Sequence, residues 1–134
     1  MLGLSAIPPY LAESYVDSAY AGWQGDLDRA YEDLDRAASL NRLADRPLVA
    51  EGAIASAAGD HERSIDSFEQ AIERKPAAWE SHYFLALELA RSDPGRARAE
   101  LDAVRRLNPG TERLRALRRA LAEGPAGGEA ARQP

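Results

Sequence analysis

Residues 25–37 read GDLDRAYEDLDRA, and 34 residues further on residues 59–71 read GDHERSIDSFEQA. A third and looser copy, DPGRARAELDAV, occupies residues 93–104. Residues of similar size recur at the same places in the copies: Ala30, Ser64 and Ala97; Leu34, Phe68 and Leu101; Ala37, Ala71 and Val104. Because about 34 residues is the length of one helix–turn–helix unit, the sequence predicts an array of helix pairs. Arrays of this kind present extended surfaces that bind other molecules.

Helical periodicity extends on both sides of these copies, from the two prolines at positions 8 and 9 to about residue 123. Glycine, proline and aspartate divide this region at points typical of helix ends. We expect helices at about residues 10–23, 27–40, 48–58, 61–74, 77–91, 94–107 and 112–123. The fold should therefore be all-α, with three helix pairs and a C-terminal helix whose polar outer face closes the array.

The two ends of the chain differ from the helical region. Residues 1–9, MLGLSAIPP, are apolar but lack basic residues and are too short to span a bilayer. We expect them to be a leader or the remnant of a membrane helix. Residues 124–134, GPAGGEAARQP, have too little apolar surface to fold and should form a disordered tail. The folded domain would then cover residues 10–123.

Composition and charge exclude several classes of function. With 45% hydrophobic and 29% charged residues, the chain is typical of one soluble globular domain. It has no cysteine, so disulfides and thiolate metal ligands are excluded. A net charge of −5 and a pI near 5.1 argue against nucleic acid as a partner. We expect no nucleic-acid binding.

The sequence contains no motif for catalysis or for a cofactor. No GxSxG, P-loop or dinucleotide-binding glycine motif is present. Ser81 and His82 are neighbours on a predicted helix, so their side chains point about 100° apart and cannot pair as nucleophile and base. His61 and His82 fall in different helices without the spacing of metal ligands. We therefore expect no enzyme activity, no cofactor and no metal.

The repeat positions resemble those of the tetratricopeptide-repeat (TPR) family. The matches are a small residue in the first helix, the turn glycine and the closing proline: Gly52 and Ala86, Gly25 and Gly59, Pro76 and Pro109. The first repeat departs from the pattern with Ser18 at the small position and Arg42 at the proline position. The resemblance implies a right-handed superhelical solenoid with repeats at about 11–44, 45–78 and 79–110 and a capping helix at 111–123. It also implies a non-enzymatic scaffold for protein–protein interaction.

In this family the first helix of each pair lines the concave face. The resemblance thus implies a groove for a peptide or protein, formed by Tyr15, Ala19, Trp23, Val49, Ala53, Tyr83, Leu87 and Arg91. Their mainly apolar character suits an apolar helix or an extended peptide. The lysine, arginine and asparagine with which chaperone-binding members hold a C-terminal carboxylate are absent from the corresponding positions. The alternative is that Tyr15 and Tyr83 belong to the core and that the array is a spacer.

A second resemblance points to an alternative function. PPYLAESYVDSAYAGW at residues 8–23 and LNP at residues 107–109 are similar to the region after the last membrane span of bacterial O-antigen-ligase-like proteins. This implies an accessory TPR domain of a membrane-embedded glycan ligase or polymerase, attached covalently to a membrane domain that carries the catalysis. The partner protein stays unidentified, homo-oligomers stay open, and the soluble domain would be cytoplasmic or tethered at a membrane.

Arginines are concentrated between residues 96 and 119. Arg105, Arg106, Arg113, Arg115, Arg118 and Arg119 are candidates for a basic rim. Such a rim would hold an anionic glycan, a lipid headgroup or an acidic protein. No aromatic residue lies among them, which disfavours nucleic acid. A solvated capping helix explains the same pattern.

Overall fold

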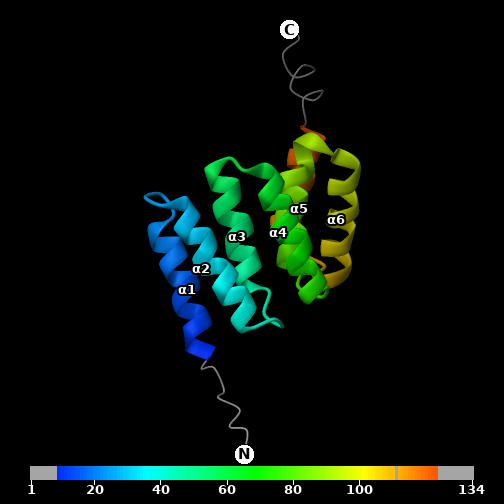
Figure 1. The fold of residues 1–134 in the computed structure, drawn as a ribbon. Coiled ribbons are helices and arrows are strands. Elements are labelled where there is room, and N and C mark those ends of the chain that lie inside the picture. The colour runs from blue at the N-terminus through cyan, green and yellow to red at the C-terminus, as the bar shows by residue number, and fades with distance from the viewer. Residues whose placement is uncertain (1–8, 111, 124–134) are drawn as a thin grey trace, which may run out of the picture. The chain divides into compact units, whose positions relative to one another are not determined.

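The structure, a computed structural model, describes residues 9–110 and 112–123, and within this part it consists of helices and turns without a strand. Figure 1 shows the helices in chain order: α1 (Pro9–Gly22), α2 (Leu27–Leu40), α3 (Arg46–Ala58), α4 (His61–Arg74), α5 (Trp79–Ser92), α6 (Pro94–Leu107) and α7 (Glu112–Ala122). The all-α prediction is confirmed, and each helix begins and ends within two residues of the predicted bounds. The predicted leader, except for Pro9, and the predicted tail lie outside the described residues.

The described helices form two compact units, one with α1 to α4 and the other with α5 to α7. In the first unit α1 packs against α2 and α3 packs against α4, while α3 also contacts α1 and α2. These four helices lie side by side in Figure 1. In the second unit α5 packs against α6, and α7 contacts both. The three predicted helix pairs and the additional last helix are therefore present.

An aspartate begins the second helix of every pair. The carboxylates of Asp26, Asp60 and Asp93 each accept a hydrogen bond from the backbone N–H three residues on, at 3.0, 3.1 and 3.1 Å. Each bond satisfies one of the N–H groups that a helix start leaves without a partner. The third copy, which has DP where the others have GD, thus begins its second helix with the same local chemistry.

The two turn glycines that align in the sequence behave differently. Gly59 adopts a left-handed conformation with φ of 83°, and the next N–H, that of Asp60, bonds to the carbonyl of Ala55 at 2.9 Å. This bond closes α3 in the way typical of helices that end at glycine. Gly25 has no such φ, because α1 already ends at Gly22 and residues 23–26 form a longer turn. Of these two glycines, Gly59 therefore depends on the conformational freedom of glycine and Gly25 does not.

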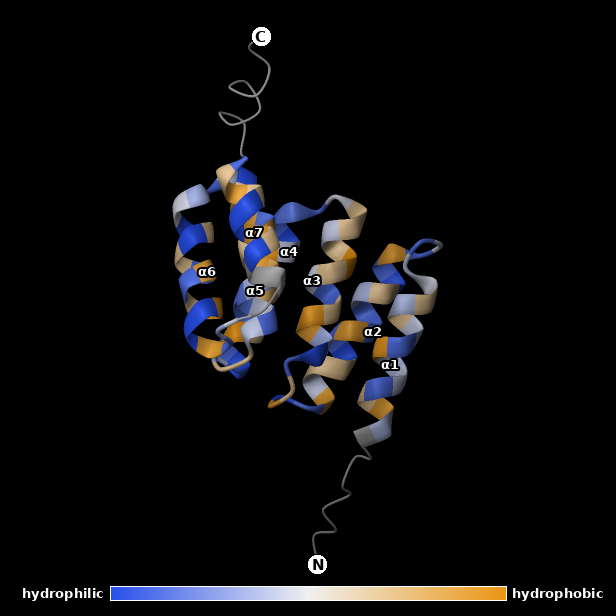
Figure 2. Cartoon of the chain, turned by 180° about the vertical axis from the view of Figure 1, so that it is seen from behind, coloured by the Kyte–Doolittle hydropathy of each residue, from blue (hydrophilic) through white to orange (hydrophobic). Residues whose placement is uncertain are grey.

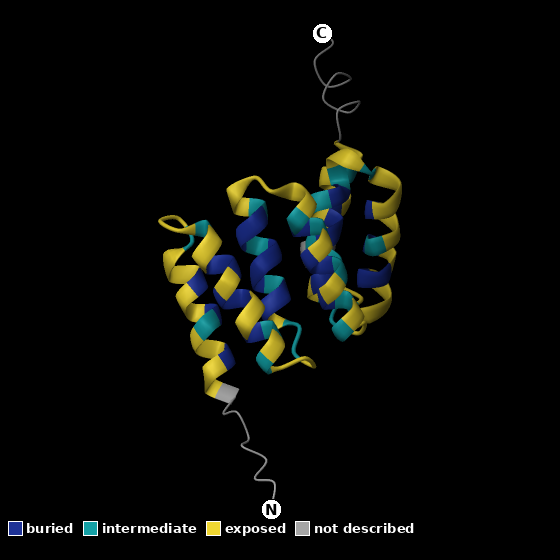
Figure 3. Ribbon diagram, viewed as in Figure 1, coloured by how far each residue is buried: buried dark blue, intermediate teal, exposed yellow. Residues whose placement is uncertain are grey.

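The core of the first unit lies between the helices and is rich in small residues. Its buried members are Ala12, Val16, Ala19, Ala30, Tyr31, Leu34, Ala37, Ala50, Ile54 and Ala55. Figure 3 shows these buried stretches in dark blue along the facing sides of α1, α2 and α3. Alanine at this density lets the helices approach closely, because it adds little side-chain volume between their backbones.

A close approach in this unit brings α3 against α4. Gly52, in the middle of α3, faces the ring of Phe68 on α4. A Cβ at position 52 would lie only 2.6 to 2.8 Å from three atoms of that ring. The ring is itself buried, with 2% of its surface exposed. The aromatic ring thus fills the space that any larger residue at position 52 would need.

The second unit has a smaller core. Ala86, Leu101, Val104 and Leu117 are buried together, with Trp79, Tyr83 and Leu121 packed against them. Leu117 attaches α7 to α5 and α6. Hydrophilic residues, blue in Figure 2, cover much of the remaining surface of α6 and α7. This is the arrangement predicted for a closing helix, since one apolar stripe is buried and the other faces are polar.

The contact between Gly52 and Phe68 predicts that replacing this glycine by alanine lowers the stability of the fold. Alanine normally stabilises a helix interior relative to glycine. Gly52→Ala should instead lower the free energy of unfolding by about 1–3 kcal/mol, because the new methyl group overlaps the Phe68 ring. Chemical denaturation followed by circular dichroism measures this change.

Gly95→Ala is the matched control, since a Cβ at this exposed helical position would meet only Asp93 Oδ1 at an ordinary 3.5 Å. It should leave the free energy of unfolding unchanged or raise it by up to about 1 kcal/mol, because only the helix propensity changes. Phe68→Leu in the Gly52→Ala background should restore part of the loss. A Gly52→Ala variant as stable as the wild type would contradict the close approach.

Candidate binding surfaces

The predicted groove residues lie on α1, α3 and α5, the first helices of the three pairs, except Trp23, which follows the end of α1. Tyr15, Val49 and Tyr83 occupy one repeat position, 34 residues apart, and each is half-buried. Four residues further along the repeat, Ala53 is half-buried and Leu87 is 42% exposed. Arg91 is exposed at the end of α5. Accessible side chains are thus present on the first helix of each pair.

Ala19 is a correction to the predicted groove. It has no exposed surface and belongs to the core of the first unit. With Ala12, Val16 and Trp23 it forms a stripe at spacings of four, three and four residues, and Trp23 also packs against that core. Because this stripe faces the neighbouring helices, Ala19 cannot contact a ligand. Ala53, at the same repeat position of the second pair, is half-buried, so the family register alone does not decide burial at this position.

The Tyr83 side chain also packs partly in the core. It packs against the buried cluster of the second unit and makes edge-to-face contacts with Trp79 and Phe84, with ring centroids 6.4 and 5.6 Å away. Such contacts hold the three rings in place. Leu87, one helical turn further on, has no comparable role in the buried cluster and is the more exposed of the two. It is therefore the clearest apolar contact point on α5.

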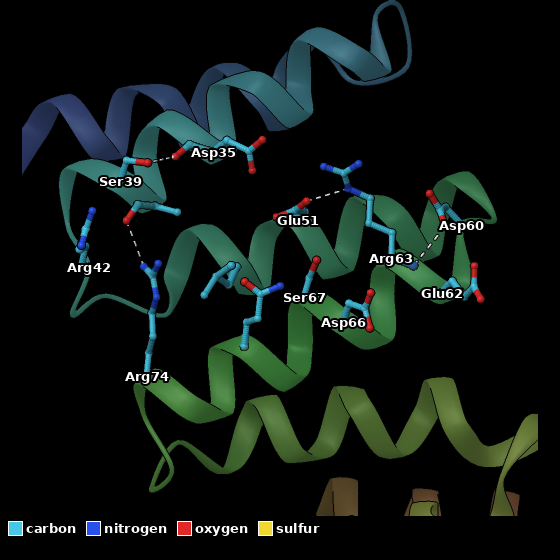
Figure 4. A pocket seen from close by; sticks show the side chains of 13 residues that line it. Asp35, Ser39, Arg42, Glu51, Asp60, Glu62, Arg63, Asp66, Ser67 and Arg74 are labelled. Atoms are coloured by element: carbon cyan, nitrogen blue, oxygen red, sulfur yellow. Dashed lines mark hydrogen bonds and ion pairs between the residues drawn. The ribbon is translucent and has the colours of Figure 1, made fainter.

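A polar groove of about 970 Å³ lies over α2, α3 and α4 of the first unit. This groove was not predicted from the sequence. Figure 4 shows that side chains from α2 and α4 flank it, with Glu51 of α3 between them. The lining residues are Asp35, Ala38, Ser39, Arg42, Leu48, Glu51, Asp60, Glu62, Arg63, Asp66, Ser67, Gln70 and Arg74. Carboxylates outnumber guanidinium groups in this list, so the groove has an acidic excess.

Glu51 is the most buried charged group of the groove, with 7% of its surface exposed. Its Oε1 accepts a hydrogen bond from Nε of Arg63 at 2.7 Å. The Arg63 guanidinium also lies over the ring of Tyr31, 3.6 Å from the ring centroid. Burial raises the pKa of the Glu51 carboxyl, and the hydrogen bond and charge of Arg63 oppose this shift. The hydrogen bond between Glu51 and Arg63 thus links α3 to α4, and the contact of Arg63 with the Tyr31 ring links α4 to α2.

Arg74 makes the second polar connection of the groove. From the end of α4, its Nη1 donates to the backbone carbonyls of Ala38, Asn41 and Ala44, at 3.2, 3.2 and 3.0 Å. These carbonyls lie at the end of α2 and in the turn after it, where a helix leaves acceptors without internal partners. Figure 4 shows Arg74 reaching across to this turn. The two arginine connections account for the inner polar groups of the groove, so we interpret it as structural.

The arginine rim proposed from the sequence is brought together in part. Arg105 and Arg106 of α6 and Arg115 and Arg118 of α7 line one pocket of about 680 Å³, together with Asp102, Pro109 and Gly110. Arg119 lies on α7 but does not line this pocket. The side chain of Arg113 lies outside the described residues.

Neither a metal site nor the serine–histidine pair is present in the described part. Among those residues no group of three His, Asp or Glu side chains is placed to hold a metal ion. His82 Nδ1 lies 2.6 Å from Oε2 of Glu100, and its Nε2 lies 3.0 Å from the carbonyl oxygen of Pro76. The hydroxyl of Ser81 is buried without a hydrogen-bond partner among the described residues. His82 thus joins α5 to α6 and to the preceding turn.

Comparison with solved structures shows the fold. The Arabidopsis OM64 TPR domain superimposes with a TM-score of 0.73 at 12% identity, over 86% of this chain and 97% of that one. The first TPR of Spaghetti (RPAP3), bound to the HSP90 peptide SRMEEVD, superimposes with a TM-score of 0.71 at 13% identity, over 88% and 98%. No family model and no curated protein matches the chain.

The described part of the chain therefore has the tetratricopeptide-repeat fold, as the sequence predicted. The second resemblance, to O-antigen-ligase-like proteins, has no counterpart among these structures and stays a prediction. None of the described helices combines the length and hydrophobicity needed to cross a membrane.

Glu51 predicts a specific pH dependence. A buried acid with a raised pKa binds its proton more tightly in the folded chain, so its contribution to stability is present below the unfolded pKa and is lost as the pH rises through the folded pKa. Glu51→Gln keeps an acceptor for Arg63 but cannot ionise. The free energy of unfolding of this variant relative to the wild type should therefore increase as the pH rises from 4.5, the usual value. Urea denaturation at a series of pH values measures the difference, with exposed Glu62→Gln as the control from the same groove. Identical pH profiles for both variants would contradict the role of burial.

Tyr31 predicts opposite effects for two substitutions. Its hydroxyl is buried without a hydrogen-bond partner among the described residues. Tyr31→Phe should therefore be neutral or raise the free energy of unfolding by up to about 1 kcal/mol. Tyr31→Leu removes the ring beneath the Arg63 guanidinium and should be destabilising by at least about 1 kcal/mol. Thermal or urea denaturation distinguishes them, and a clearly destabilised Tyr31→Phe variant would show that the hydroxyl has a partner in solution.

Proposed function

We propose that this chain is a non-enzymatic protein-interaction module that binds an apolar helix or an extended peptide on the exposed side of α5, the first helix of its third pair. The observation that carries the proposal is Leu87, whose aliphatic side chain is 42% exposed beside half-buried Tyr83 on this helix. Tyr15 and Val49, at the position of Tyr83 in the first two pairs, are also half-buried. The fold supports the proposal, since a neighbour with the same fold holds a peptide.

The surface of α5 indicates the chemistry of the ligand. Tyr83, Leu87 and Arg91 follow each other at intervals of four residues and so lie along one side of the helix. Leu87 offers an exposed aliphatic contact and Arg91 an exposed positive charge. This side of α5 suits a ligand with an apolar residue near Leu87 and a carboxylate near Arg91. We infer an amphipathic peptide with acidic residues beside its apolar positions.

This surface should discriminate against the peptide that the structural neighbour binds. The residues that grip a C-terminal carboxylate in chaperone-binding relatives are absent from the corresponding positions of this sequence. SRMEEVD should therefore bind weakly or not at all, and it is a useful negative probe.

A peptide-display selection tests the proposal. Selection against the wild-type chain should enrich sequences with apolar residues at helical spacing and flanking acidic residues. Leu87→Glu should weaken binding of a selected synthetic peptide by about tenfold or more, because it places a charge in the apolar contact. Fluorescence anisotropy measures the affinity, and circular dichroism verifies that the helices persist.

Leu107→Glu is the matched control. Leu107 is 39% exposed against 42% for Leu87, and it lies on α6, the second helix of the same pair. This variant should bind the selected peptide within about twofold of the wild type, since it adds the same charge away from the proposed surface. Equal loss in both variants would contradict the assignment of the surface. Failure of the wild type to enrich any peptide would contradict peptide binding itself.

A further inference from the structure

Asp33 is a buried carboxylate that lines a pocket of about 400 Å³ between the end of α1 and the start of α2. Among the described residues only Asp33 and Glu51 are buried acids, and each is 7% exposed. Arg63 compensates Glu51 with a guanidinium. Asp33 instead accepts a hydrogen bond at Oδ2 from the neutral hydroxyl of Ser18, at 3.1 Å. The two buried acids therefore differ in whether a cation accompanies them.

The hydrogen bond from Ser18 does not explain the negative charge of Asp33. An asparagine would accept the same bond through its amide oxygen without the cost of burying a charge. Within the described part of the chain, Oδ1 of Asp33 has no hydrogen-bond donor and the carboxylate has no ion pair. Arg29 lines the same pocket one helical turn earlier, but it is not paired with Asp33. One oxygen and the charge of Asp33 are thus left for a ligand.

The end of α1 adds negative potential to this pocket. Ala21 and Gly22, the last two residues of α1, line it, and the carbonyl end of a helix carries a partial negative charge. α1 has no basic residue in its last turn to offset that charge. α2 begins here with the opposite partial charge, but the Asp26 carboxylate already caps it. With Asp26 and Asp33 against Arg29, the lining also has one more acidic than basic side chain.

We propose that this pocket binds a primary alkylammonium group, as carried by a lysine side chain or by a small aliphatic amine. An ammonium group has three donors. Oδ1 of Asp33 would accept from one of them, and the Ser18 oxygen, whose own proton goes to Oδ2, can accept from another. A guanidinium binds best to two free oxygens of one carboxylate. Ser18 already engages one oxygen of Asp33, so the geometry favours an ammonium group.

The walls of the pocket suit an aliphatic chain behind the ammonium group. They are formed in large part by the small residues Ala21, Gly22, Gly25 and Ala30. The volume of about 400 Å³ exceeds what an ammonium group alone needs, and methylene groups favour such apolar walls. A divalent metal ion prefers several oxygen ligands, and the described residues bring no group of three His, Asp or Glu side chains together.

Titration with lysine blocked at its backbone amino and carboxyl groups, followed by NMR of the backbone amides, tests the proposal. The amide signals of Gly22 and Gly25 should shift at low salt, and the affinity should fall as salt screens the charges. Asp33→Asn keeps an acceptor for Ser18 but removes the charge, and should weaken binding by about tenfold or more. Asp28→Asn is the matched control, since it removes a charge from an exposed position of α2 outside this pocket. It should bind within about twofold of the wild type.

A second variant blocks the pocket without changing its charge. A Cβ at position 22 would meet no atom within 4 Å, so Gly22→Leu should fold normally and fill the space that the aliphatic chain needs. It should weaken binding by about tenfold or more. Circular dichroism verifies that the helices persist in each variant. Gly22→Leu therefore tests the site even if Asp33→Asn alters the stability of the fold.

A parallel titration with butylamine identifies the source of the ammonium group. Tighter binding of the blocked lysine indicates a lysine side chain, and tighter binding of butylamine indicates a small amine. Either result supports the site when the shifts are lost in Asp33→Asn and Gly22→Leu. No shift with either probe, equal loss in Asp28→Asn, shifts that persist in Asp33→Asn, or equally tight binding of blocked arginine would overturn it. The peptide selection above depends on α5, so the two proposals succeed or fail separately.

Discussion

The approach of α3 to α4 at Gly52 is the constraint on which the first unit depends. The Phe68 ring occupies the space where a side chain at position 52 would lie. In the third pair Ala86 stands at the position of Gly52 and Leu101 at the position of Phe68. The first residue is larger than its counterpart and the second is smaller, and both are buried in one cluster. In the first pair the corresponding residue is Ser18, whose hydroxyl donates to Oδ2 of buried Asp33 at 3.1 Å. The three pairs thus place different combinations of size and polarity at this repeat position.

Close packing also explains the polar groove of the first unit. Because α3 packs against α1, α2 and α4, even its charged residue Glu51 is largely removed from water. Arg63 compensates this carboxylate and is itself held against Tyr31. Arg74, which belongs to the second helix pair, donates hydrogen bonds to the backbone carbonyls at the end of α2 and in the turn after it. The polar side chains of the groove are therefore better explained as connections between helix pairs than as an empty ligand site.

The candidate surfaces of the second unit have a different physical character from the polar groove. Leu87 and Tyr83 of α5 keep apolar area accessible, and burial of such area on binding would be favourable. The pocket between α6 and α7 is lined mainly by arginine side chains. The groove of the first unit, in contrast, is lined by polar groups that bond to one another.

The sequence by itself determined the fold class, the helix bounds and the pairing of helices. These follow from local chemistry: the recurring aspartate caps, the helical spacing of apolar residues and the period of 34 residues. It also indicated the arginine cluster, although not which arginines meet. Only the tertiary structure decided that Ala19 is buried, that Gly59 but not Gly25 is left-handed, and that Glu51, Arg63 and Tyr31 form one connection. These features depend on how one helix is rotated against its neighbours, and a periodic sequence pattern does not contain that rotation.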